Sequence, residues 1–271
     1  MQAQLTMRPT NGVSLQSTWV WSKTMGSQGT YIDPVNRRLN YYAQQSSPHA
    51  LRMNGTVELP IGPNKLLFAN TTGWVAHVIE RWQTSFIFNA SSATRTSAVP
   101  GTSHFYGNPG FMIASNNWTL PNPNFEWSGN SGSLYGNTYT SAPDPQCTDS
   151  SQVTGPDRMG TNLQSACAIV ALAARNADGT PGEVLLKYAK PGEVGNLGFG
   201  NFTTFGNWTL DMSASKTFNI SESKSVQIRI DSTNVLNHPT PDAPSFSANT
   251  FGVSDGKSGE RSLQGQIRIN F

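Results

Sequence analysis

The chain has 271 residues and a formal net charge of +2; only 13% of its residues are charged and 36% are hydrophobic. Ordinary globular domains have about a quarter of their residues charged and a larger apolar share. The small net charge gives no reason to expect a nucleic-acid partner. No apolar run reaches the roughly 18 residues that a membrane-spanning helix requires, so a helical membrane protein is excluded.

Alternation of apolar and polar residues predicts the first strands, because successive side chains of a strand point to opposite faces. We expect two strands near 2–8 and 13–24, joined by a hairpin turn at Gly12, which follows an asparagine. Two further strands are expected near 49–60 and 82–92. The residues just before the fourth strand could form one or two helical turns.

Residues 93–206 are expected to be one long irregular loop, because they are rich in Gly, Pro, Asn and Ser and show no sustained period. Such a loop counts against a compact soluble domain and is tolerated as a functional surface loop. It contains Cys147 and Cys167, which we expect to form a disulfide in an oxidising compartment, with two free thiols as the alternative. Two cysteines without a nearby histidine make an incomplete zinc site, so we expect no metal site.

Alternation returns in the last third of the chain and predicts strands near 207–219, 224–234 and 260–271, with a polar loop at 235–259. Lys216 falls on the apolar face of its strand. This conflict is reduced if the residue lies near an interface and extends its ammonium group into water.

Seven strands with one apolar and one polar face fit two architectures. Short turns that alternate with long loops, and aromatic residues near the ends of the apolar faces, are typical of an outer-membrane barrel. A soluble or cell-surface β-sandwich that binds carbohydrate or another partner gives the same alternation and remains the alternative. We expect an all-β fold: an antiparallel meander of about seven long strands that forms the C-terminal part of a transmembrane β-barrel, with a long irregular extracellular loop.

Six segments carry a resemblance to a known family, and they cover residues 12–23, 51–62, 80–86, 195–198, 211–218 and 228–239. Together with the final Phe271 they resemble the C-terminal barrel of Oar-like TonB-dependent outer-membrane receptors, which have a carboxypeptidase-regulatory-like domain. The resemblance implies a plugged barrel of about 22 strands that moves a bulky solute across the bacterial outer membrane with energy supplied through TonB. It also implies that Phe271 is the signal that the barrel-assembly machinery recognises.

The chain departs from this family because no segment corresponds to the plug, the TonB-contacting segment or the regulatory domain. We therefore expect residues 1–271 to be a partial barrel domain, either a fragment or a truncated reading frame. Its expected partners are outer-membrane lipid, the missing N-terminal barrel strands and plug, TonB through that plug, and the assembly machinery.

No catalytic residue and no cofactor are expected. Ser213 and Lys216 have the spacing found in serine β-lactamases, but they fall in an alternating strand rather than at the start of a helix. The charged residues expected to line a barrel lumen are Asp211, Arg229, Asp231 and Arg268. They are interpreted either as solute contacts or as solvated or paired neighbours within the barrel wall.

Overall fold

The computed structural model describes residues 1–10, 12–27, 41–43, 47–63, 65–96, 113–119, 123–145, 170–188, 196–197, 200–221 and 224–271. Seven long strands form one antiparallel sheet in the order β1-β2-β5-β6-β15-β16-β20. These strands are β1 (Gln2–Thr10), β2 (Val13–Trp21), β5 (His49–Glu58), β6 (Trp82–Ser91), β15 (Asn207–Asn219), β16 (Ser225–Thr233) and β20 (Ser262–Asn270). The sheet confirms the predicted meander, because each long strand pairs with the next long strand along the chain.

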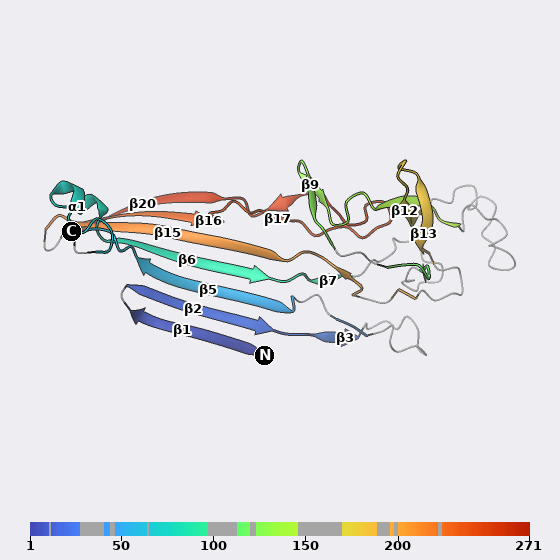
Figure 1. Ribbon diagram of the computed structural model, residues 1–271, viewed down its shortest axis with the longest axis horizontal. Coiled ribbons are helices and arrows are strands. Elements are labelled where there is room, and N and C mark those ends of the chain that lie inside the picture. Colours follow the sequence, from blue (N-terminus) through green and yellow to red (C-terminus); the bar gives the residue numbers. More distant parts are fainter. Residues whose placement is uncertain are drawn as a thin grey trace.

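The connections of the sheet differ strongly between its two ends (Figure 1). The short connections, the helix α1 (Trp74–Ile79) and the C-terminus lie at one end, on the left of the view. The small strands of the long connections lie at the opposite end, on the right. We call these the turn end and the loop end of the sheet.

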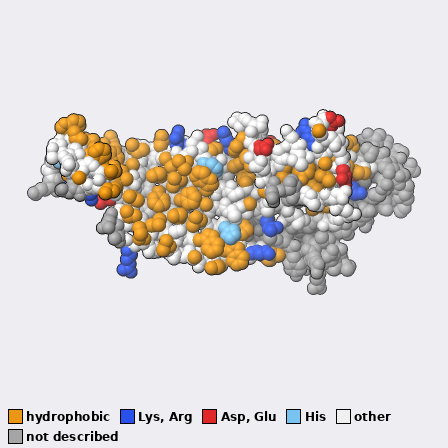
Figure 2. Space-filling view, in the orientation of Figure 1, with side chains coloured by type: hydrophobic (Ala, Val, Ile, Leu, Met, Phe, Trp, Pro, Cys, Tyr) orange, Lys and Arg blue, Asp and Glu red, His pale blue; other side chains and the backbone are white. Residues whose placement is uncertain are grey.

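Strand register gives the sheet one apolar face, because directly opposed residues of antiparallel strands lie on the same face. The apolar side chains at opposed positions are Ala3, Leu5, Met7, Val13, Leu15, Trp19, Trp21, Leu51, Met53, Val57, Trp82, Phe86, Phe88, Ala90, Trp208, Leu210, Met212, Ala214, Phe218, Val226, Ile228, Ile230, Leu263, Ile267 and Ile269. Figure 2 shows hydrophobic side chains covering the visible face of the sheet. The alternation in the sequence therefore continues across all seven strands as one surface.

The described part of residues 93–206 is more regular than expected. It contains β7 (Arg95–Thr96), β8 (Ile113–Ala114), β9 (Glu126–Ser128), β10 (Ser131–Ser133), β11 (Tyr139–Pro143), β12 (Val170–Arg175), β13 (Pro181–Lys187) and β14 (Phe202–Thr203). Four of these strands form a sheet in the order β11-β12-β13-β8. The prediction of an irregular loop missed them because the strands are short and several pair with partners far away in the sequence.

Three further pairs complete the loop end. β3 (Met25–Ser27) pairs with β4 (Tyr41–Ala43), and β17 (Thr240–Pro241) pairs with β19 (Lys257–Ser258). β18 (Val253–Ser254) pairs with β10, which links the last long connection to the central one.

Lys216 lies near the turn end of β15, but its ammonium group does not extend into water. Its side chain lies on the apolar face, in register with Trp82 and Ile228, and the residue is 2% exposed. Its ammonium group donates hydrogen bonds to the carbonyl oxygens of Val78 (2.7 Å) and Glu80 (2.6 Å). The backbone at the end of α1 covers this lysine and supplies the polar partners that water would otherwise provide.

Helix α1 is short and sharply bounded. It follows Gly73, whose φ of 72° requires a conformation that glycine adopts easily, and it ends at Glu80, which is extended. Arg81 then has a φ of 59°, which turns the chain back into β6. Among the described residues, no helix is both long and apolar enough to cross a membrane.

Candidate functional site

The polar face of the sheet is the first surface that could bind a solute. Its opposed positions carry mainly hydroxyl and amide side chains, namely Gln4, Thr6, Ser14, Gln16, Thr18, Asn54, Thr56, Gln83, Ser85, Asn89, Thr209, Ser213, Ser215, Thr217, Gln227, Gln264 and Gln266. Some of these hydroxyls are already paired across strands. Ser14 and Thr56 lie 2.7 Å apart, and Ser85 and Ser213 lie 2.6 Å apart, oxygen to oxygen. The polar face therefore offers mainly neutral hydrogen-bond donors and acceptors rather than a strong electrostatic potential of one sign.

An open hollow of about 430 Å³ lies on strands β2, β5 and β6. Its lining residues are Ser14, Arg52, Met53, Asn54, Gly55, Thr56, Ser85, Phe86, Ile87 and Asn89. The hydroxyl and amide groups of this lining, with the guanidinium of Arg52, can hydrogen-bond to a polar solute. Among the described residues that line the hollow, Arg52 is the only charged one, which gives this part of the wall a local preference for hydrogen-bond acceptor groups.

Gly55 explains the shape of the wall at this hollow. A Cβ atom at this position would lie 2.5 Å from the carbonyl oxygen of Ser14 and 2.8 Å from Cε1 of Phe86. The glycine therefore allows the Phe86 ring to lie over β5 on the apolar face. The predictions from sequence treated Gly55 only as one more residue of an alternating strand.

The structure brings two of the four predicted lumen residues together. The guanidinium of Arg229 donates to Asp231, with Nε 2.8 Å from Oδ1 and Nη2 also 2.8 Å from Oδ1. Asp211 Oδ1 instead accepts the backbone N–H of Asn234 at 2.8 Å, and Arg268 lies in register with Gln227. Arg229, Asp231 and Asp211 thus have partners within the wall, while contact of any of the four with a solute stays a prediction.

The sequence also points to Phe271, Cys147 and Cys167. Phe271 follows the end of β20 and is 96% exposed, and its role in assembly stays a prediction. Cys147 and Cys167 lie outside the described residues. In the described part of the chain, no three His, Cys, Asp or Glu side chains gather as metal ligands would.

The Ser213 and Lys216 pair does not have the geometry of a serine β-lactamase. Ser213 lies in register with Asp231 and bonds to Ser85 on the polar face, whereas Lys216 lies on the apolar face. The two side chains therefore point to opposite sides of β15.

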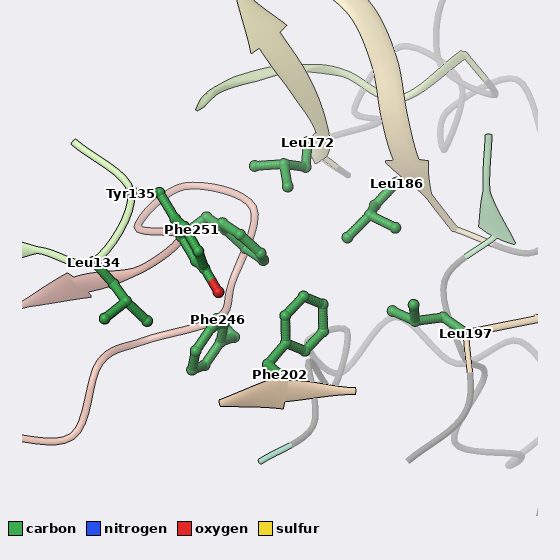
Figure 3. Close-up of a cluster of buried hydrophobic side chains, with 8 residues drawn as sticks. All are labelled: Leu134, Tyr135, Leu172, Leu186, Leu197, Phe202, Phe246 and Phe251. Carbon is green, nitrogen blue, oxygen red and sulfur yellow. The ribbon is translucent and has the colours of Figure 1, made fainter. Parts of the chain in front are cut away.

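The second candidate surface is the loop end, where the long connections pack around a shared core (Figure 3). We call this group the loop core; it consists of Leu134, Tyr135, Leu172, Leu186, Leu197, Phe202, Phe246 and Phe251. In Figure 3 the two leucines of β12 and β13 point toward the aromatic rings. The Phe202 ring stacks on Phe246 with centroids 5.0 Å apart and meets the Phe251 ring edge-on at 5.3 Å.

The loop core joins two connections that are separate in the sequence. Phe202 belongs to the connection between β6 and β15, whereas Phe246 and Phe251 belong to the connection between β16 and β20. The expectation that 235–259 is simply a polar loop missed these two phenylalanines. Aromatic residues within otherwise polar segments were the available signal, since a buried aromatic side chain contributes a large apolar area.

Burial also affects a titratable group of the loop core. Tyr135 is 5% exposed, and its hydroxyl has no hydrogen-bond partner among the described residues. Burial, and then the charge of neighbouring Tyr139, raise the pKa of Tyr135 from 10.0 to about 12. The Tyr135 ring nevertheless packs well, stacking on Phe251 with centroids 5.6 Å apart.

A sheet with one continuous apolar face, one polar face, short turns at one end and long loops at the other has the form of an outer-membrane barrel wall. The chain belongs to the outer membrane beta barrel domain family, whose sequence model matches residues 1–264. Neither the curated proteins nor the solved structures compared with the chain gave a match.

Family membership places the protein in the outer membrane, which disagrees with the soluble form of the alternative β-sandwich. In such barrels the outward band is apolar, the interior is polar, and the longer loops are extracellular. The apolar face described above is accordingly the lipid-facing face, and the loop core lies on the extracellular side.

Proposed function

We propose that the chain forms part of a TonB-dependent outer-membrane transporter, which captures a bulky solute outside the cell and moves it through a plugged barrel. In this proposal the chain supplies a segment of the barrel wall together with its long extracellular loops. The plug, TonB acting through it, further barrel strands and the barrel-assembly machinery are the partners that the proposal requires.

The observation that carries this proposal is the loop core. Two connections separated by two strands bury eight residues in common, so the extracellular end presents a packed surface rather than independent loops. A structured surface reduces the ordering cost of binding a ligand. Such a surface suits a receptor that captures its solute before transport.

The polar face provides a surface along which a solute could move after capture. Its neutral hydroxyl and amide groups can exchange hydrogen bonds with a solute that has many polar groups, and its charges at Arg229 and Asp231 already neutralise each other. A neutral hydrogen-bonding wall allows a bulky polar solute to pass without being held by strong ionic contacts.

Uptake in whole cells tests the proposal. Cells with and without the protein are given a panel of fluorescent oligosaccharides and peptides too large for general porins, before and after the inner-membrane proton gradient is dissipated. We expect saturable, protein-dependent uptake of at least one solute that stops when the gradient is lost. Protein-dependent uptake that continues without the gradient would indicate a passive channel and contradict the proposal.

The loop core also allows a control within this experiment. Phe202→Ala should lower uptake by loosening the capture surface, whereas Ile220→Ala, at an exposed position after β15 at the opposite, turn end, should leave it close to wild type. Equal uptake by both variants would remove the loop core from the proposed mechanism.

A further inference from the structure

The connection between β5 and β6 exposes an unusual amount of apolar surface at the turn end. Its exposed large side chains are Leu66 (83%), Leu67 (50%), Phe68 (65%), Trp74 (77%), Val75 (38%) and Val78 (47%). Leaving such side chains in water costs about 25 cal/mol for each Å² of apolar surface. By comparison, β15 and β16 are joined at the same end by a short turn after Asn219.

The position of α1 relative to the barrel wall is set by Lys216. This residue lies on the lipid-facing face, and its ammonium group donates to the carbonyl oxygens of Val78 and Glu80 at the end of the helix. The indole N–H of Trp82 also donates to the Val78 carbonyl oxygen, at 3.1 Å. Since the last carbonyls of a helix lack partners within the helix, these contacts both satisfy them and hold α1 over the outer face of the wall.

The exposed apolar side chains of the connection are therefore continuous with the lipid-facing face. Phe218 lies directly beneath the lysine, with its ring centroid 4.8 Å from the ammonium nitrogen, and Val226 lies in register with Phe218. The turn end faces the periplasm in this family of barrels, so α1 lies at the periplasmic end of the wall.

We infer that residues 59–63 and 65–81 form a membrane-interface collar, in which the exposed apolar side chains of α1 and of the preceding residues enter the phospholipid leaflet around the outside of the barrel. Phospholipid is the occupant that the contacts favour, because the collar adjoins the face that already meets lipid. A tryptophan at the head-group level and apolar side chains in the acyl region are the arrangement that a bilayer interface stabilises. The inference depends on the membrane position of the wall and not on the proposed transport.

Quenching of Trp74 by lipid tests this inference. The full chain is folded into vesicles of phosphatidylethanolamine and phosphatidylglycerol, part of which carry bromine near the head-group end of one acyl chain. We expect brominated lipid to quench the wild type more than Trp74→Phe, because the variant lacks a tryptophan that contacts the bromine.

Two tryptophans of similar exposure serve as controls. Trp21 is 46% exposed on the lipid-facing face, so Trp21→Phe should also show less bromine quenching than the wild type. Trp127 is 44% exposed in the loops, so Trp127→Phe should be quenched by bromine as much as the wild type. If Trp21 is quenched by bromine and Trp74 is quenched only by aqueous iodide, the collar lies in water and the inference is wrong. If neither reagent reaches Trp74, a protein surface such as a second copy covers the collar, and the inference of a phospholipid contact is wrong. A lack of bromine quenching at both Trp21 and Trp74 would overturn the inference together with the membrane position of the wall.

Discussion

Lys216 and Val78 are joined by a hydrogen bond of 2.7 Å between the ammonium group of a strand residue and the last turn of a helix. The bond joins the turn end of β15 to the connection between β5 and β6, which ends more than a hundred residues earlier in the sequence. It explains why a lysine can lie on an apolar face: helix carbonyl oxygens and the Trp82 and Phe218 rings surround its charge.

Replacing Lys216 with methionine should release α1 from the barrel wall. Hydrogen bonds to a charged group contribute about 1.5–3 kcal/mol each, so we expect a local loss of about 2 kcal/mol or more. That loss corresponds to roughly thirtyfold faster amide exchange in residues 74–81, measured by mass spectrometry. Lys224→Met, at the same end of the sheet, is the control; equal exchange in both variants would contradict the role of Lys216.

A positive charge on the lipid-facing face should impair membrane integration. Ile230 lies near the middle of β16, is 50% exposed, and faces Ala214 and Gly265 in register. An arginine near the midplane of the lipid face costs about 2–4 kcal/mol. Ile230→Arg should therefore reduce the amount of protein in the outer membrane, measured by fractionation. Gln264→Arg, which faces Asp231 on the polar face, should integrate normally.

Two glycines of the apolar face should respond differently to alanine. Gly55→Ala places a Cβ against Ser14 and Phe86, and such overpacking costs about 1–3 kcal/mol. Gly265 has no neighbouring atom within 4 Å of the same position, so Gly265→Ala should be neutral or stabilise the wall by about 0.4–1 kcal/mol. Urea unfolding in vesicles, followed by tryptophan fluorescence, distinguishes the two. A wild-type midpoint for Gly55→Ala would show that Phe86 moves aside at little cost.

Truncating the centre of the loop core should loosen the extracellular end without unfolding the wall. Phe202 is 1% exposed, and removing a buried phenylalanine side chain costs about 3–5 kcal/mol. Protease added to intact cells should cleave the loops of Phe202→Ala faster than those of wild type, while the heat-dependent gel mobility of the barrel stays the same. Trp127→Ala is the control. Loss of the folded gel form would instead show that the wall depends on the loop core.

The loop core should also loosen at alkaline pH. Because the pKa of Tyr135 is about 12 in the folded protein against an ordinary 10.0, ionisation is easier in the unfolded loops. The stability that neutral Tyr135 contributes is complete below pH 10 and is lost as the pH rises toward 12. Tyr135→Phe should weaken this alkaline transition, measured by protease sensitivity of the loops. It should cost little at neutral pH, because the hydroxyl has no hydrogen-bond partner in the described part of the chain. An unchanged alkaline transition in Tyr135→Phe would exclude this tyrosine as its source.

The long strands could be predicted from the sequence because each carries its own alternation. A face that meets lipid requires apolar residues at every second position, and this local pattern remains visible in strands such as β15, whose observed bounds equal the predicted ones. Gly12, with a φ of 79°, likewise marks the turn after β1 by its own conformational preference.

The loop end could not be predicted in the same way, because its contacts join distant segments. Ala171, Leu172 and Ala173 of β12 are all fully buried, so the strand shows no alternation. β10 pairs with β18 at Ser254, and β7 pairs with β14 at Phe202. The partners of Lys216 could not be predicted either, because they are backbone carbonyls, which leave no trace in side-chain patterns.

Phe202 stacks on Phe246, so the connection between β6 and β15 and the connection between β16 and β20 depend on each other's sequence. The two connections should therefore evolve together and should be redesigned together. Exchanging either connection alone with that of a relative would place a foreign surface against half of a packed aromatic group. Grafts that carry both connections together preserve the contact between the aromatic rings. A new binding specificity should therefore be transferable only when both loops are exchanged together.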